Sequence, residues 1–220
     1  MEFDLAYLTK QLPALRAGFV LTIQISAIAV AISVLIGLVG ASLRVLRVPV
    51  FSQLVVAYVE FIRNTPLLVQ LFFVFFGLPE LGLRLSLFWS GVLALTLWAG
   101  AFQTENVRGG LAAVAPGLRE AARAVGLTSD QYLRLIGLPL AVRTGLPAML
   151  NTCVSLVKNS AYVSAIGLMD LAGVAFDRMA SDFRAFEMLA VLLVGYLSLV
   201  LTLSAAVRVI EHRLQAPFRP

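Results

Sequence analysis

The stretch "GFVLTIQISAIAVAISVLIGLVGASL" covers Gly18–Leu43, and no charged residue occurs between Arg16 and Arg44. A helix needs about 20 mostly apolar residues to cross the hydrocarbon core of a bilayer, so this stretch predicts a transmembrane helix. The whole chain agrees, because 60% of its 220 residues are hydrophobic, 13% are charged and its mean hydropathy is +0.93. A soluble domain carries about 25% charged residues. We therefore expect an integral membrane protein.

Five segments meet this length requirement, and the chain shows no internal repeat. They are Gly18–Leu43, Gln53–Gly77, Leu87–Arg108, Thr144–Leu168 and Phe186–Ile210. The second segment contains Asn64-Thr65-Pro66, and proline removes a helical hydrogen bond and clashes with the preceding turn. We predict an all-α integral membrane protein that forms a single domain over residues 1–220. It has five transmembrane helices, the second of them broken.

Basic residues are unequally distributed between the two sides of such a five-helix topology. One side holds Arg44, Arg47, Arg108, Arg119, Arg123, Arg134, Arg143, Arg208, Arg213 and Arg219. The other side holds Lys10, Arg16, Arg84, Arg178 and Arg184. Positive residues accumulate on the cytoplasmic side of membrane proteins. The N-terminus is therefore predicted outside, the C-terminus in the cytoplasm and the loop of residues 109–143 in the cytoplasm. The net charge of +5 follows from this bias, and we expect no nucleic-acid partner.

Several kinds of site are excluded by residues that the chain lacks. Cys153 is its only cysteine and His212 its only histidine, so we expect no disulfide and no thiolate or histidine metal site. The only lysines, Lys10 and Lys158, do not follow a glycine, so the phosphate-binding motif G-x-x-x-x-G-K-[ST] is absent. We expect a non-catalytic chain without a cofactor or metal of its own.

The longest cytoplasmic loop contains "EAARAVGLTSDQYLRLIGLP", residues Glu120–Pro139, which predicts two short helices. Pro116 suits the first turn of a helix, and Gly126 is a natural left-handed end to it. Thr128 with Gln131 forms a capping box for a second helix, which Pro139 is expected to stop.

Such a helix pair admits three interpretations: a plain connection, a DNA-reading motif or a docking element. The second helix offers one arginine, a poor match to phosphate and base contacts. Leu127, Tyr132, Leu133 and Ile136 would be costly in water unless a partner or the rest of the domain covers them.

The loop resembles the "EAA" loop found in permease subunits of bacterial ABC importers. The match consists of Glu120-Ala121-Ala122, three residues, Gly126, nine residues, Ile136, one residue and Leu138-Pro139. "VEFIRNTPLLVQLFF", "ENVRGGLAAVAPGLREAARAVGLT" and "LVKNSAYVSAIGLMDLA" resemble the polar amino-acid permeases of that group, the histidine, glutamine and glutamate/aspartate permeases. The resemblance covers about residues 18–212.

This resemblance implies a type I importer fold with a cytoplasmic coupling helix in the bacterial cytoplasmic (inner) membrane. Its implied partners are two copies of an ATP-binding subunit, a second permease subunit that is identical or paralogous, an extracytoplasmic amino-acid-binding protein and membrane lipid. The residues expected to couple to the ATPase are Glu120, Ala121, Ala122, Gly126, Leu127, Ile136 and Pro139.

Ionisable residues at membrane depth usually face a cavity or a partner. Glu60 and Arg63 are three residues apart and can neutralise each other, and Glu105 and Arg108 repeat that spacing. Lys158, midway along the fourth segment, should have an anion nearby, either one of these glutamates or a substrate carboxylate.

An amino acid needs a cation for its carboxylate and an anion for its amino group. The expected substrate-binding residues are Glu60, Arg63, Thr65, Gln103, Glu105, Lys158 and Asn159. Some family members carry aspartate where this chain has Asn159, and the resemblance is strongest to glutamate/aspartate permeases. We therefore expect an acidic substrate. The alternatives are an autonomous secondary transporter or channel, and a membrane-tethered DNA-binding regulator.

Overall fold

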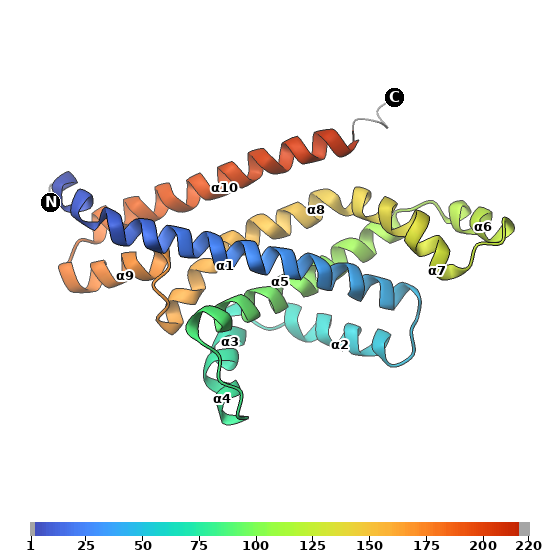
Figure 1. Cartoon of the computed structure of the whole chain (residues 1–220), viewed down its shortest axis with the longest axis horizontal. Helices are drawn as coiled ribbons and strands as arrows, with labels where there is room; N and C mark the ends of the chain where they lie inside the picture. The colour runs from blue at the N-terminus through green and yellow to red at the C-terminus, as the bar shows by residue number, and fades with distance from the viewer. Residues whose placement is uncertain (1–2, 216–220) are drawn as a thin grey trace. The chain divides into compact units, whose positions relative to one another are not determined.

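The computed structural model describes residues 3–215. Within this range the regular secondary structure is helical, without a strand, and short turns connect the helices (Figure 1). The helices are α1 Leu5–Val45, α2 Phe51–Arg63, α3 Leu67–Phe72, α4 Leu78–Glu80, α5 Leu87–Ala112, α6 Pro116–Ala124, α7 Ser129–Tyr132, α8 Leu138–Asn159, α9 Leu171–Asp182 and α10 Ala185–Gln215. Two π-helical turns, η1 Phe73–Gly77 and η2 Leu133–Gly137, and one 3-10 helix, η3 Ser160–Ile166, complete the elements. Arg219, counted above for orientation, lies outside the described residues, as does the side chain of Arg213.

Four helical stretches in the described part of the chain are long and apolar enough to cross a membrane. They are α1, α5, the run from Ser129 to Ile166 and α10. The pair formed by α2 and the helical run Leu67–Glu80 would make a fifth crossing if it counts as one span. The all-helical membrane class is confirmed, and five crossings stay a prediction.

The break predicted in the second segment is confirmed. Helix α2 ends at Arg63 and α3 begins at Leu67, directly after Pro66. The Asn64 backbone N–H donates to the carbonyl of Glu60, and its side-chain amide donates to the same oxygen at 2.7 Å. The Asn64 side chain therefore gives the Glu60 carbonyl a second hydrogen bond where the helix ends.

The chain divides into two compact units. The first contains Met1–Ala29, Leu67–Leu95 and Val154–Ala205, and the second contains Val30–Pro66, Thr96–Cys153 and Ala206–Pro220. Helices α1, α5, α8 and α10 contribute residues to both units.

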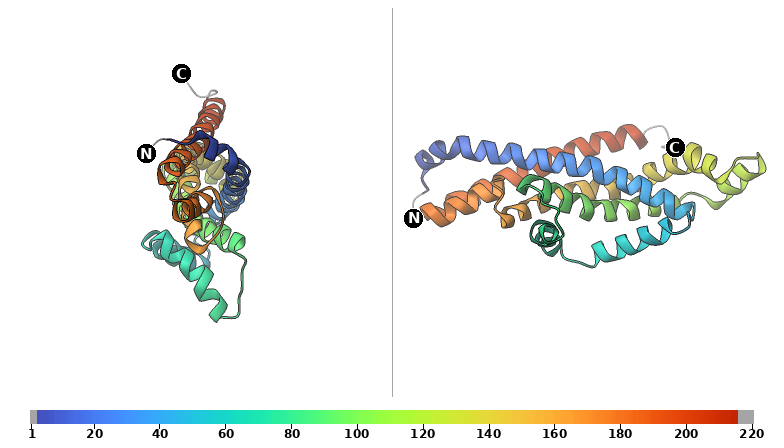
Figure 2. Two further views of the ribbon diagram at one scale, coloured as in Figure 1. Left: turned by 90° about the vertical axis from the view of Figure 1, so that its left-hand side faces the viewer. Right: turned by 60° about the horizontal axis from the view of Figure 1, so that its bottom comes forward.

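In the first unit, α9 packs beside the N-terminal part of α1 and the start of α10 (Figure 2). Its core residues are Leu15, Leu171, Val174, Ala175 and Met188. Sequence reasoning left residues 171–182 as a loop and missed α9.

Asp170 caps α9 and connects three helices of the first unit. Its fully buried carboxylate accepts hydrogen bonds from the Gly173 backbone N–H at 2.9 Å, the Tyr196 hydroxyl at 3.2 Å and the Thr22 hydroxyl at 3.3 Å. Burial raises the pKa of Asp170, and these three hydrogen bonds oppose that rise.

In the second unit, the C-terminal part of α1 packs with α5 and α8 around Ala41, Val107, Ala141 and Met149. The α5 and α8 backbones touch at Gly110, where a Cβ atom would lie 2.1 Å from the Ala141 carbonyl oxygen. This contact requires glycine because small residues let membrane helices approach closely.

Candidate functional site

Glu105, on α5 in the second unit, is the centre of a cluster of guanidinium groups. Its carboxylate accepts hydrogen bonds from Arg108 Nη2 at 2.7 Å and Nε at 2.9 Å, and a further one from Arg44 on α1. The Arg63 guanidinium, on α2, lies 3.9 Å from Glu105 Oε2. The Glu105 side chain is 17% exposed. Three arginines from three helices therefore surround one largely buried carboxylate.

Arg63 has a second contact, with the aromatic ring of Phe102. Its Cζ atom lies 5.2 Å from the ring centroid, within the range of a cation–π interaction. The expected pairing of Arg63 with Glu60 was wrong, because among the described residues the carboxylate that Arg63 pairs with is Glu105. Helix α2 packs against α5 through Val59, Ile62 and Ala101, which places the end of α2 beside Glu105. The predicted pairing of Glu105 with Arg108 is confirmed.

Two other candidate residues lie at the end of α2. The Thr65 hydroxyl donates to the Phe61 carbonyl at 2.7 Å. Exposed Glu60 accepts a hydrogen bond from the Asn64 amide at 3.3 Å. Both side chains therefore support the helix break, and Glu60 also presents a carboxylate at the surface of the unit.

Gln103 is fully buried between α5 and α8. Its amide nitrogen donates to the Met149 carbonyl at 3.0 Å and contacts Cys153 Sγ at 3.5 Å. Its oxygen accepts from the Asn106 amide at 3.3 Å, and Asn106 also donates to Thr152 at 2.8 Å. These bonds hold α5 to α8, so both ends of the Gln103 amide are engaged within the unit.

Lys158 and Asn159 belong to the first unit, at the end of α8 where η3 begins. Lys158 is exposed and forms no ion pair with the described residues of that unit, and Asn159 is half-buried. Lys158 lies inside the apolar helical run Ser129–Ile166, which continues beyond it as η3. The Ser160 hydroxyl donates a hydrogen bond to the Val157 carbonyl at 2.7 Å. Such bonds compete with the regular α-helical pattern, and α8 gives way to the 3-10 helix η3 at this residue.

Residues 109–143 contain the two predicted helices, and the signals that begin and end the first helix and begin the second are confirmed. Helix α6 begins at Pro116, and Gly126 follows its end with a φ of 84°. The capping box is complete: Gln131 N–H donates to Thr128 Oγ1 at 3.2 Å, and Thr128 N–H donates to Gln131 Oε1 at 2.9 Å.

Pro139 does not stop the second helix, contrary to expectation. It is the second residue of α8, and α7, η2 and α8 follow one another without a gap. Proline clashes with the carbonyl of the residue four positions earlier, here Leu135, which lies inside the π-helical turn η2. We attribute the continuation to this wider turn, because it changes the helical bonding where the clash would occur.

The loop's apolar residues divide between the interior of the unit and its surface. Ala122, Tyr132 and Leu133 are buried by the unit itself, while Leu127 and Ile136 are half-buried. Glu120 and Ala121 are exposed, as is Gly126. The large apolar residues on the surface are Leu118, Val125 and Leu135, with 41%, 77% and 66% of their areas exposed. Sequence reasoning did not single out these three.

Arg44 and Phe102 were missed as members of the Glu105 cluster, and Asn106 was missed as a hydrogen-bonding partner of Gln103. Arg44 was assigned only to membrane orientation, since a basic residue at the end of a span is expected there. Its partner, Glu105, is 61 positions away in the sequence, so no local spacing signals the pair. The adjacency of Phe102 and Asn106 to Gln103 and Glu105 on α5 was the one available signal.

Comparison with known proteins identifies the family of this chain. The model of the family described as "Binding-protein-dependent transport system inner membrane component" matches residues 9–216. A probable glutamine ABC transporter permease protein of Bacillus subtilis (strain 168) is 35% identical over 216 residues, 97% of this chain and 99% of the relative. A second protein of that description from the same organism is 38% identical over 201 residues, 91% and 93% of the two chains.

Among solved structures, a chain of an amino acid ABC transporter, crystallised with histidines, superposes with a TM-score of 0.88. It is 34% identical, and the match covers 97% of this chain and 100% of that one. This similarity assigns the type I ABC importer permease fold.

The chain therefore belongs to the family of binding-protein-dependent transport system inner membrane components. It is an integral membrane permease subunit of the ABC transporter class. The expectation of a non-catalytic chain is confirmed by these relatives, which are permease proteins, and ATP hydrolysis belongs to a separate subunit. The family membership does not favour an autonomous transporter or a DNA-binding regulator.

Proposed function

We propose that this chain forms half of the membrane pathway of an ATP-driven importer for polar amino acids in the bacterial cytoplasmic membrane. A second permease subunit, identical or paralogous, supplies the other half. Two ATP-binding subunits supply the energy, and an extracytoplasmic binding protein delivers the amino acid. The observation that carries this proposal is the cluster of three arginines around Glu105 in a membrane segment. Relatives described as glutamine permeases support the amino-acid class.

Within the cluster, Arg63 is the cation that we assign to the substrate carboxylate. Arg44 and Arg108 already hydrogen-bond Glu105, whereas Arg63 is 3.9 Å from it and 42% exposed. A guanidinium binds a carboxylate through two parallel hydrogen bonds. Exposed Glu60 on the same helix offers a partner for the amino group.

We propose an acidic amino acid, glutamate or aspartate, as the preferred substrate. Three guanidiniums meet the single carboxylate of Glu105, so the cluster has an excess of positive charge that favours a second substrate carboxylate. Thr65 and Gln103 complete the proposed set of the second unit, and in Gln103 the amide would have to exchange its present partners. Lys158, an exposed cation, and Asn159 are separate candidates in the first unit.

The EAA loop is proposed to transmit motion from the ATP-binding subunit. Helix α6 is closed by Gly126, α7 is capped by Thr128 and Gln131, and Tyr132 and Leu133 anchor the loop in the second unit. The exposed Leu118 and Val125 give it an apolar surface for docking. Glu120, Ala121, Ala122, Gly126, Leu127, Ile136 and Pro139 are the proposed coupling residues. ATP and Mg would bind to the partner only.

The test is uptake by the complete complex in proteoliposomes, with its binding protein, ATP on the ATPase side and labelled glutamate, aspartate or glutamine. We expect ATP-dependent uptake, with glutamate and aspartate preferred. Arg63→Gln should weaken productive binding about 10- to 100-fold, because it removes a charge-assisted contact worth about 1.5–3 kcal/mol. Lys158→Met should act similarly without lowering the yield of complex.

Arg84→Gln is the matched control, since Arg84 is exposed, lies outside both the cluster and the EAA loop, and forms no ion pair among the described residues. Preferred uptake of glutamine would refute the acidic assignment and retain the importer. Uptake without ATP would refute the importer. Wild-type uptake per folded complex in both the Arg63 and Lys158 variants would remove these residues from the site.

A further inference from the structure

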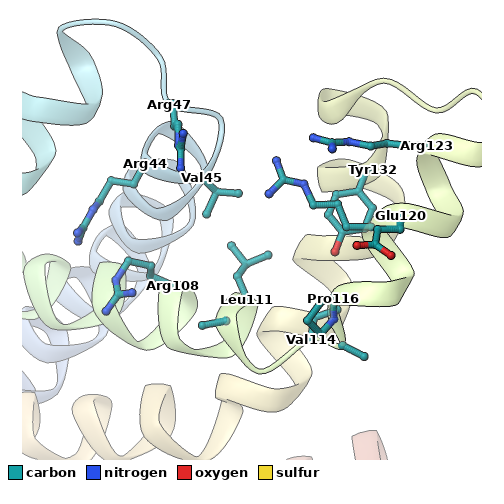
Figure 3. Close-up of a pocket in the computed structure, with 13 residues that line it drawn as sticks. Arg44, Val45, Arg47, Arg108, Leu111, Val114, Pro116, Glu120, Arg123 and Tyr132 are labelled. Atoms are coloured by element: carbon teal, nitrogen blue, oxygen red, sulfur yellow. The ribbon is translucent and has the colours of Figure 1, made fainter.

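The second unit contains a basic cavity of about 550 Å³, which shares Arg44 and Arg108 with the Glu105 cluster but is not lined by Arg63 or Glu105. The ends of α1 and α5 form one side, and α6 with Tyr132 forms the other (Figure 3). Its basic lining residues are Arg44, Arg47, Arg108, Arg119 and Arg123. The acidic residue among the lining residues is Glu120.

The positive charge of this cavity is only partly neutralised. Arg44 and Arg108 are bonded to Glu105. Within residues 3–215, no ion pair is formed by Arg47, Arg119 or Arg123. Even with Glu105 and Glu120 included, five guanidiniums meet two carboxylates.

The arrangement of these arginines favours an anion between them. Arg119 and Arg123 are four residues apart on α6, so they share one helix face, and like charges at this spacing destabilise a helix. Figure 3 shows Arg123 on the α6 side of the cavity and Arg47 on the α1 side. An anion between the two sides would relieve the repulsion.

The other lining residues indicate which anion fits. Val45, Leu111 and Val114 line the same space, together with Pro116 and the buried ring of Tyr132. A small soluble anion would make no favourable contact with this apolar wall. A phospholipid matches both sides of the cavity: its phosphate can bind the guanidinium groups, and its glycerol and acyl chains can contact the apolar wall.

We propose that this cavity binds the headgroup phosphate of an anionic phospholipid of the cytoplasmic leaflet. The ends of α1 and α5 lie where the basic residues place the cytoplasmic boundary of the membrane, and basic pockets at that depth suit anionic headgroups. The site rests on this orientation but not on the identity of the transported amino acid. Arg47, Arg119 and Arg123 hold the phosphate.

The test is native mass spectrometry of the complete complex purified in detergent, titrated with phosphatidylglycerol, phosphatidylcholine or inorganic phosphate. We expect retained phosphatidylglycerol, little phosphatidylcholine, and no displacement of the bound lipid by inorganic phosphate at matched concentration. Arg119→Gln, Arg123→Gln and Arg47→Gln should each weaken phosphatidylglycerol binding about tenfold, the loss expected for one charge-assisted contact. All three side chains are exposed, so the variants should fold.

Arg134→Gln is the control here, because it removes a positive charge from the same loop outside the cavity and should leave lipid binding unchanged. Equal binding of phosphatidylglycerol by the cavity variants and the control would overturn the proposal. Displacement by inorganic phosphate alone would assign the site to a soluble anion and overturn the lipid. If the cavity variants lose the co-purified ATP-binding subunit while lipid binding stays intact, the arginines bind a protein partner, and the lipid proposal is overturned.

Discussion

Replacing Glu105 by glutamine should destabilise the second unit, although the side chain keeps its size. The carboxylate accepts two hydrogen bonds from Arg108 and one from Arg44, and Arg63 lies 3.9 Å away. Glutamine has one acceptor oxygen and no charge. That oxygen can keep the two Arg108 bonds, which share Oε2, or the Arg44 bond to Oε1, but not both sets, and the ionic attraction is lost in either case. The three guanidiniums would then repel one another without a counter-charge.

The magnitude follows from the burial and number of the contacts. A hydrogen bond to a charged group contributes about 1.5–3 kcal/mol, and breaking a fully buried ion pair costs about 3–5 kcal/mol. Glu105 is 17% exposed, while Arg63 and Arg108 are each 42% exposed, so water compensates in part. We expect a loss of about 2–4 kcal/mol, or a midpoint of unfolding lower by at least about 4 °C.

Cys153 provides the assay, because it is the only cysteine and is buried in the same unit. A thiol-reactive dye added to the purified protein during heating will report when the unit opens. Glu60→Gln is the matched control, since Glu60 is exposed and makes no ion pair among the described residues. It should change stability by less than about 0.5 kcal/mol.

A double variant tests the mechanism further. Adding Arg108→Gln to Glu105→Gln removes one of the uncompensated charges, so the two losses should not add, and the coupling should be about 1–3 kcal/mol. Equal unfolding midpoints for wild type, Glu60→Gln and Glu105→Gln would refute the view that this carboxylate holds the cluster together.

Three further predictions concern other parts of the chain. Gly126→Asp should abolish transport and co-purification of the ATPase. The chain should still fold, because a Cβ there meets no atom within 4 Å and the left-handed backbone costs only about 1–2 kcal/mol. Gly126→Ala isolates that backbone strain, and normal transport by Gly126→Asp would contradict docking through the loop. A cysteine at exposed Asp177 should react with an impermeant maleimide from outside intact spheroplasts, and one at exposed Ser129 only after lysis, both in a Cys153→Ser background; the opposite pattern would reverse the topology. Burial raises the pKa of Asp170, so as pH rises the unfolded chain loses this proton before the folded chain does. The free energy of unfolding should therefore decrease over the pH range between the ordinary aspartate pKa and the raised pKa. Asp170→Asn keeps the N-cap oxygen and should remove this part of the pH dependence of thermal unfolding, whereas an unchanged pH profile would show that Asp170 does not cause it.

Several features could be predicted from the sequence because they depend on residues within one or two helical turns. The apolar run of Gly18–Leu43 predicts a membrane helix by its length alone, and Pro66 predicts the break after α2. The start of α6 at Pro116 and its end before Gly126 follow from what each backbone allows. The resemblance carried by Glu120–Pro139 indicated the family for the same reason, since its positions lie at fixed short spacing.

Contacts between distant segments required the tertiary structure. Arg44 and Arg63 reach Glu105 from other helices. The sequence spacing of Glu60 and Arg63 allowed that pair, but it could not show that Arg63 pairs with Glu105 instead. The engagement of Gln103 between α5 and α8, and of Asp170 with Thr22 and Tyr196, likewise depends on which helix faces meet. Sequence spacing specifies which residues share a helix face, but the packing of that face against another helix determines which charges and hydrogen-bonding groups find each other.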